Sequence, residues 1–297
     1  MHALWRGGPS RDGAQTRIEA LPDGWLWGAH LPGGAFRAMA FVDPPLGRDR
    51  GAAYERLLAT SQLFAELPRV ASLEGSVHAC GATTYAVTDP IDATCIRVGE
   101  AAFAIDPLSS SGVQTAIQTG LAAAACVHSI LASDGDTAAA IEYYAAQQRH
   151  AVRRHAATAA GIYAEHESHA AAPFWSRRAV PATTRPRPPA AAAAAATAGG
   201  PLADLLPRRV RLPAGAGVTD TPCLVGDRIE RRRALTHPDL DRAVAFLGGH
   251  ELAPLLDALD REPSLAQAIG RWNSSLGPAE GDAVARWLHA RGLLVAI

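Results

Sequence analysis

The sequence contains no lysine, so arginine supplies all 28 of its fixed side-chain cations. This absence excludes a lysine nucleophile, base or Schiff base from the chain. An excess of charge of either sign is also lacking, because 28 cations face 29 acids and the formal net charge is −1. With no basic excess, there is no broad electrostatic case for a nucleic-acid or anionic-membrane partner, and we expect neither.

Cysteine is scarce and its spacing is uninformative. The four cysteines, Cys80, Cys95, Cys126 and Cys223, form no CxxC pair and no zinc-type pattern with histidine, so we expect no metal site. The sequence shows neither a secretory signal nor a credible uncharged apolar run of about 18 residues. These absences predict a cytoplasmic protein without a membrane span.

A GxGxxG fingerprint, the glycine-rich turn that places a dinucleotide pyrophosphate at a helix N-terminus, is also absent. The nearest segment, residues 5–9, has the wrong spacing, and we expect no strand before it. Nothing in these 297 residues is therefore predicted to bind the ADP half of a dinucleotide.

What the sequence does contain predicts mixed helix and sheet. Apolar runs separated by Gly/Pro turns predict an antiparallel meander over 16–43, and strand composition returns at 76–88. Apolar spacing predicts helices over 51–67, 109–131 and 137–169. A Pro- and Ala-rich stretch predicts a linker, followed by strands over 208–235, three short helices and a final strand, an order typical of a winged-helix-like module. We expect three regions, residues 1–178, 179–207 and 208–297.

Residues 95–113 carry the most informative pattern. A short apolar strand over 95–98 is expected to lead into Gly99-Glu100, a loop containing Asp106-Pro107-Leu108, and a serine-rich turn that opens a helix near Gly112. A helix N-terminus presents unpaired N–H groups, and a glycine there lets a flat ligand approach the backbone closely. An acid just past a strand end can accept hydrogen bonds from the hydroxyls of a sugar or ribityl chain.

The segment Val98–Val113 resembles the second flavin-binding motif of FAD-dependent monooxygenases of the tryptophan-halogenase-like group. The family motif has Gly-Asp followed by an Asp-Pro-Leu-Ser-Ser-x-Gly-Val loop, and Glu100 replaces the aspartate here. The resemblance covers about residues 16–178. It implies an α/β flavin-monooxygenase fold, α+β in the portion present. It also implies that roughly 150 residues of the dinucleotide-binding half lie outside this sequence, with Met1 inside the substrate-domain sheet.

The resemblance also implies site residues. Gly99 and Glu100 correspond to positions near the ribityl–pyrophosphate part of FAD, and the loop from Pro107 to Val113 to positions along the isoalloxazine ring. The complete set of expected cofactor-binding residues is Gly99, Glu100, Asp106, Pro107, Leu108, Ser110, Gly112 and Val113. On the sheet that walls the substrate cavity in such flavoproteins, core packing and substrate contact both remain open for Trp25, Trp27 and Tyr85. No catalytic residue is identified.

Three functions remain open on this evidence. The first is O2-dependent oxidation of an aromatic small molecule or a peptide, including a tryptophan side chain, with electrons from a flavin reductase or NAD(P)H. The second is halogenation, which in the family relies on a lysine; this sequence has none, although the corresponding position would lie in the part outside it. The third is a truncated, non-catalytic flavoprotein whose C-terminal module serves as an interaction domain. Flavin absorbance distinguishes the third from the others, and chloride dependence distinguishes the second from the first.

Overall fold

The computed structural model describes residues 1–7, 15–44, 49–179, 201–259 and 261–297, which form two compact units. Of these residues, unit 1 contains 1–85, 104–112 and 154–179, and unit 2 contains 86–103, 113–153 and those from 201 onward. Most of the expected linker, 179–207, lies outside the described residues, and its last part begins with a short helix, α7.

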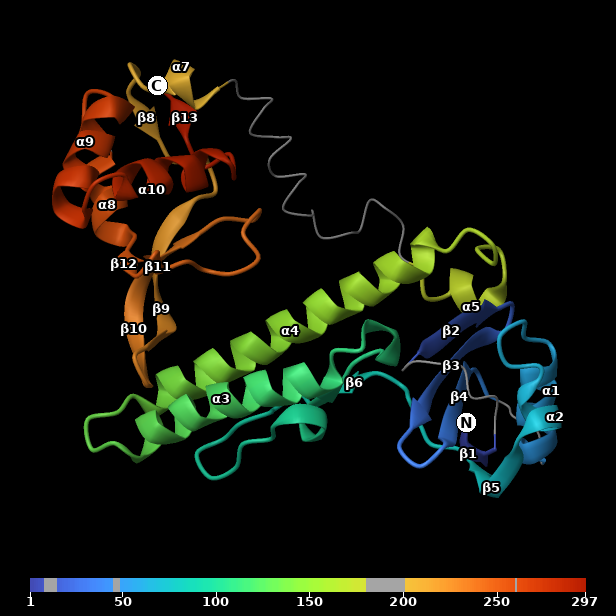
Figure 1. Ribbon diagram of the computed structural model, residues 1–297. Coiled ribbons are helices and arrows are strands. Elements are labelled where there is room, and N and C mark those ends of the chain that lie inside the picture. Colours follow the sequence, from blue (N-terminus) through green and yellow to red (C-terminus); the bar gives the residue numbers. More distant parts are fainter. Residues whose placement is uncertain (8–14, 45–48, 180–200, 260) are drawn as a thin grey trace. The chain divides into compact units, whose positions relative to one another are not determined.

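Figure 1 labels the elements along the chain. The strands are β1 His2–Arg6, β2 Thr16–Leu21, β3 Gly24–Leu31, β4 Ala35–Val42, β5 Ser72–His78, β6 Tyr85–Ala86, β7 Phe103–Ala104, β8 Val210–Arg211, β9 Gly217–Val225, β10 Arg228–Thr236, β11 Phe246–Leu247, β12 His250–Glu251 and β13 Val295–Ala296. The α-helices are α1 Arg50–Ala59, α2 Leu67–Val70, α3 Gly112–Leu131, α4 Thr137–Glu165, α5 Pro173–Ser176, α7 Leu202–Leu205, α8 Ala253–Leu259, α9 Leu265–Leu276 and α10 Glu280–His289. Short 3-10 helices cover Gly99–Ala101 and Pro107–Ser109.

Unit 1 is built on a five-stranded antiparallel sheet in the order β2-β3-β4-β1-β5. The meander predicted over 16–43 is confirmed as β2, β3 and β4, in which Trp25 pairs with Phe41. The expectation that no strand precedes Gly7 is wrong, because β1 lies between β4 and β5 in this sheet. In this strand, His2–Arg6, buried side chains alternate over only 5 residues, and so short a pattern does not identify a strand from the sequence.

The two faces of this sheet carry different cores, as the period-two alternation of a strand requires. On one face Leu26 packs with Tyr54 and Leu58 of α1, and all three side chains are fully buried. On the other face Trp25 packs with residues from the C-terminal part of α4 and from α5. The sheet thus joins a helix near the N-terminus to segments more than 100 residues later in the sequence.

The helix predicted over 51–67 ends at Ala59 as α1, and the next helix, α2, begins only at Leu67. Between them, the Glu19 carboxylate of β2 accepts hydrogen bonds from the Ser61 hydroxyl and from the backbone N–H groups of Gln62 and Leu63. These contacts satisfy amides that would otherwise donate along a continuous helix. A tertiary contact therefore overrides the helical spacing of the sequence.

In unit 2, α3 and the first part of α4 form an antiparallel pair, side by side in Figure 1. Small residues make the contact, with Cys126 of α3 fully buried beside Ala139 and Ala140 of α4. The β9–β10 hairpin joins them, since Ile229 belongs to the same core and its N–H donates to the buried Ser129 hydroxyl at 2.7 Å.

Most of the large apolar residues of α3 face away from this pair, and Ile130, which is partly buried against its core, is the exception. Side-chain exposure is 77% at Val113, 59% at Ile117, 70% at Leu121 and 79% at Leu131. The sequence predicts these residues as the apolar stripe of the helix, and the described part of the chain leaves that stripe uncovered. Close approach of α3 to α4 requires small side chains, so alanine, cysteine and serine occupy the buried face instead.

The C-terminal part of unit 2 has a core of its own, formed by α8, α9 and α10 around the fully buried Trp272 and Leu288. The predicted winged helix is not confirmed. The long hairpin β9–β10 precedes the three helices, and the final strand β13 pairs with β8, which also lies before them. In the described residues, no helix combines the length and hydrophobicity needed to cross a membrane.

Candidate functional site

Gly99 adopts a left-handed conformation, with φ of +55°. Its N–H donates to the Thr119 hydroxyl of α3 at 2.9 Å. A Cβ at this position would lie 3.1 Å from the Cβ of Ala116, tighter than an ordinary contact. Glycine is therefore required here both by backbone conformation and by the close approach of α3.

The segment before Gly99 is anchored to α4. Tyr144 donates its hydroxyl hydrogen to the Arg97 carbonyl oxygen at 2.7 Å, and burial raises the pKa of Tyr144 to about 12. The strand expected over 95–98 reduces to a single bridge between Ile91 and Ile96. Glu100 follows within the 3-10 helix and is exposed. This half of the motif is thus a tight turn held by two helices.

In unit 1, Asp106 organises the loop that contains the Asp-Pro-Leu-Ser sequence. Its Oδ1 accepts from the Leu108 N–H at 2.9 Å, capping the short helix Pro107–Ser109. Ser110 then adopts a left-handed conformation with φ of +51°, which is uncommon for a residue other than glycine. The left-handed residue of this loop is therefore a serine, and Gly112 lies just beyond it at the start of α3.

Tyr163, near the end of α4, reaches the same carboxylate. Its hydroxyl lies 3.1 Å from Oδ2 and 3.3 Å from Oδ1 of Asp106. Burial raises the pKa of Tyr163, and the neighbouring Asp106 carboxylate raises it further. The phenol therefore stays protonated over the physiological range and acts as the donor.

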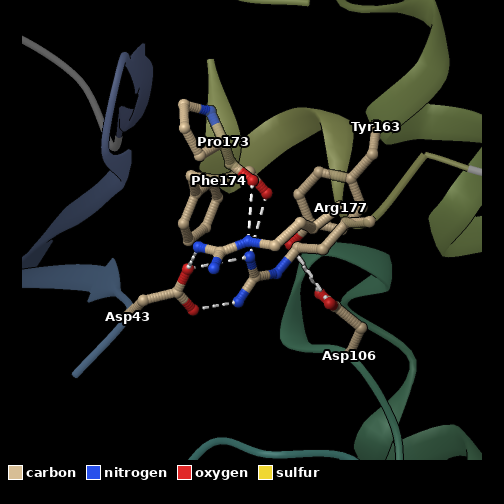
Figure 2. A network of polar contacts seen from close by, with 7 residues as sticks. Asp43, Asp106, Tyr163, Pro173, Phe174 and Arg177 are labelled. Atoms are coloured by element: carbon tan, nitrogen blue, oxygen red, sulfur yellow. Dashed lines mark hydrogen bonds and ion pairs between the residues drawn. The ribbon is translucent and has the colours of Figure 1, made fainter. Parts of the chain in front are cut away.

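Figure 2 shows that Asp43 pairs with two arginines, Arg177 and Arg178, close to the Asp106–Tyr163 contact. Arg177 and Arg178 both donate to the Asp43 carboxylate, which follows β4. The Arg178 hydrogen bonds hold the pKa of Asp43 below its usual range. Arg178 also lies over the Phe174 ring, 3.9 Å from its centroid, and 5.9 Å from that of Tyr163. The sheet, α5 and the end of α4 are thereby joined around the Asp106 loop.

The first residues of α3 are open to solvent. No heavy atom lies within 4 Å of a Cβ built on Gly112, and Val113 is 77% exposed. These residues therefore leave room for a ligand to approach the helix N-terminus, where the first amides have no partner within the helix.

The three expected substrate residues lie in different environments. Trp25 is only 4% exposed and stacks on Phe41 with ring centroids 3.8 Å apart, so its side chain is committed to the core. Trp27 is partly buried against the same cluster. Tyr85 is 48% exposed in β6. Trp27 and Tyr85 therefore keep part of their ring surface exposed, whereas Trp25 is packed in the cluster against which Trp27 lies.

Sequence reasoning missed Tyr163, Asp43 and Thr119. Tyr163 lies within the helix predicted over 137–169, and no local pattern pairs it with Asp106, 57 positions earlier. Trp175 packs onto the sheet, since it is buried and donates to the Leu21 carbonyl oxygen at 2.8 Å. Among the described residues, no group of three His, Cys, Asp or Glu side chains could hold a metal ion.

The fold is that of solved flavin-dependent enzymes. A peptidyl tryptophan dihydroxylase essential for tryptophylquinone cofactor biogenesis, QhpG, matches 98% of this chain with a TM-score of 0.74 and 24% identity. The flavin-dependent halogenase CmlS matches 99% with a TM-score of 0.68 and 18% identity. This chain spans 63% of each of those two chains.

The chain belongs to the tryptophan halogenase family, whose model matches residues 8–203. A tryptophan 2-halogenase from Chondromyces crocatus is 31% identical over 134 residues, which are 43% of this chain and 26% of that protein. The resemblance seen in residues 95–113 is thus confirmed at the level of the family and the fold.

Proposed function

We propose that this chain forms the flavin-loop and substrate-sheet portion of an FAD-dependent oxidoreductase that oxidises the aromatic ring of tryptophan, free or within a peptide. The observation that carries the proposal is the Asp106–Ser110 turn leading into the open N-terminus of α3. Family membership and two flavoprotein structures of similar fold support it.

The residues present fit a flavin. The turn at Gly99 and the exposed Glu100 provide a polar approach for the ribityl–pyrophosphate chain, as the family motif implies. Gly112 presents open backbone to a flat ring, and the positive end of α3 favours negative charge on a reduced ring. Pro107, Leu108, Ser110 and Val113 would line the same ring, and Asp106 shapes the turn.

Reduced FAD, when bound, supplies the electrons with which molecular oxygen is activated. The chain's own contribution is to orient the ring of the substrate and to exclude water from the site. We assign the aromatic contact to Trp27 and Tyr85, which leave ring surface accessible, whereas Trp25 is packed in the cluster beside Trp27. A flavin reductase or NAD(P)H would in turn reduce the FAD. The glycine loop for the ADP half of FAD must come from a segment outside these 297 residues.

Hydroxylation and halogenation remain the two candidate reactions. Halogenation is favoured by the curated relative and by CmlS, and hydroxylation by the greater structural similarity of the dihydroxylase. A protein containing this chain together with the glycine-loop segment should be incubated with reduced FAD, O2 and a tryptophan-containing peptide, with and without chloride. Mass spectrometry would show incorporation of oxygen, independent of chloride, for the hydroxylase, and of chlorine for the halogenase. No FAD binding and no modified peptide would favour the non-catalytic alternative.

A further inference from the structure

The Asp106 carboxylate makes two kinds of contact at once. It caps its own turn through the Leu108 N–H at 2.9 Å, and it accepts the Tyr163 hydroxyl at 3.1 Å. The turn that follows contains Ser110 at φ of +51°, a conformation that costs an L-residue roughly 1–2 kcal/mol. Such a conformation persists only where surrounding contacts determine it.

Tyr163 is well suited to supply such a contact, because its own position is fixed. The side chain is 3% exposed, and its ring meets those of Trp175 and Phe174 edge-on, with centroids 5.5 and 6.1 Å away. The Arg178 guanidinium lies nearby and is itself held by Asp43. The hydroxyl is thus presented to Asp106 from a packed aromatic cluster, of which Figure 2 shows Tyr163 and Phe174.

We propose that Tyr163 is a positioning residue: through Asp106 it holds the Pro107–Ser110 turn in the conformation from which the flavin is contacted. Its role for the flavin rests on the proposed function, whereas its effect on the turn does not. Tyr163 does not touch the cofactor in this proposal. It acts by restricting Asp106 to one orientation, so that the turn does not have to be ordered when flavin binds.

The first test follows hydrogen–deuterium exchange of the 104–112 amides in the full chain. Tyr163→Phe removes only the hydroxyl and keeps the packed ring. Because Tyr163→Phe loses the hydrogen bond to the charged Asp106 acceptor, we expect about tenfold faster exchange of the amides in this segment. Tyr54→Phe is the matched control, because its hydroxyl is also buried and donates to the Ala38 carbonyl oxygen at 3.0 Å, within the other core of unit 1. The control should leave 104–112 unchanged. Equal exchange in wild type and Tyr163→Phe would overturn the proposal.

A double-variant comparison separates positioning from general packing. In Asp106→Ala the turn has already lost its acceptor, so adding Tyr163→Phe should produce no further acceleration. Additive effects would show that Tyr163 acts independently of Asp106 and would also overturn the proposal. FAD affinity, measured by quenching of flavin fluorescence in a protein that includes the glycine-loop segment, should fall about tenfold in Tyr163→Phe and be unchanged in Tyr54→Phe. Absence of FAD binding by the wild type would refute the proposed function, while the exchange results would still decide whether Tyr163 holds the turn.

Discussion

Arg178 donates to Oδ1 of Asp43 at 2.5 Å and thereby connects the residue after β4 to the segment after α5. Both side chains are 31% exposed, so the pair is partly screened by water. Its value to stability is consequently modest, about 1 kcal/mol or less.

We expect Asp43→Asn to lower the free energy of unfolding by about that amount at pH 7. Because Arg178 and Arg177 depress the pKa of Asp43 in the folded state, the stabilisation is complete above the ordinary aspartate pKa of about 3.9. It is lost as pH falls through the lower folded-state value. Denaturant titrations of wild type and variant should therefore differ at pH 7 and converge in acid, once the pH lies below the folded-state pKa of Asp43. A difference that persists unchanged in acid would contradict the assignment to this ion pair.

Gly99→Ala should be destabilising by about 1–2 kcal/mol. The new methyl would approach Ala116 at 3.1 Å, and alanine is disfavoured at φ of +55°. Gly120→Ala is a suitable control, because that glycine lies within α3 and its Cβ would meet no heavy atom within 4 Å. The control should be neutral or stabilising in thermal unfolding. Equal stability of Gly99→Ala and wild type would show that α3 can move away from the turn.

Gly112→Val should separate flavin binding from folding. A side chain at Gly112 meets nothing within 4 Å, so the variant should unfold within about 0.5 kcal/mol of wild type. In the protein that contains the glycine-loop segment, the same branched side chain would occupy the space proposed for the flavin ring. Flavin absorbance of the purified variant should then be lost. Unchanged flavin content would remove the start of α3 from the site.

Glu100→Asp restores the residue typical of the family motif at this position. We expect FAD affinity to be retained or increased in the same complete protein. Because the side chain is exposed, we expect the substitution to change the free energy of unfolding by less than about 0.5 kcal/mol, so that a change in affinity can be measured directly. Titration of FAD against the wild type and against Glu100→Asp provides the comparison. A clear loss of affinity in Glu100→Asp would show that the longer glutamate side chain makes a contact that aspartate cannot make.

The parts of the fold that follow from local patterns were predictable. The meander over 16–43 shows apolar runs between turn residues, and α4 has apolar residues at helical spacing over 29 positions. The flavin-type motif was recognisable because its residues are contiguous in sequence, from Gly99 to Val113.

The rest depends on contacts between distant residues. Tyr163 and Asp106 are 57 positions apart, and Asp43 and Arg178 are 135 apart. Likewise, the helical periodicity of α3 identified its large apolar side chains but could not show that the facing helix accepts only small ones. Close packing at Cys126 and Ala139 determines which face of α3 is buried. The order of residues along one helix does not predict this packing, because it depends on the facing helix.

The uncovered stripe of α3 makes a further prediction. Leu121 is 70% exposed, so Leu121→Ala should change the free energy of unfolding of this chain by less than about 0.5 kcal/mol. Leu288→Ala, at a fully buried position of α10, is the matched control and should cost about 2–5 kcal/mol. In a protein that also contains the glycine-loop segment, a larger effect of Leu121→Ala would identify the stripe as the surface that this segment covers. A large effect in the present chain alone would contradict the exposed position of α3.

The C-terminal helices offer a last test, because three helices after a hairpin invite an assignment to DNA binding. We predict against it. Residues 237–297 contain five arginines and eight acids, a formal net charge of −3, whereas a DNA-binding surface needs an excess of cations to neutralise phosphates. On α10 itself, Glu280 and Asp282 occupy the first turn, and Arg291 just beyond the helix lies over the Trp287 ring at 4.2 Å. Fluorescence anisotropy with duplex DNA should therefore show no binding tighter than about micromolar at physiological salt. Salt-sensitive binding below that concentration would refute the prediction and would require a basic surface elsewhere in the protein.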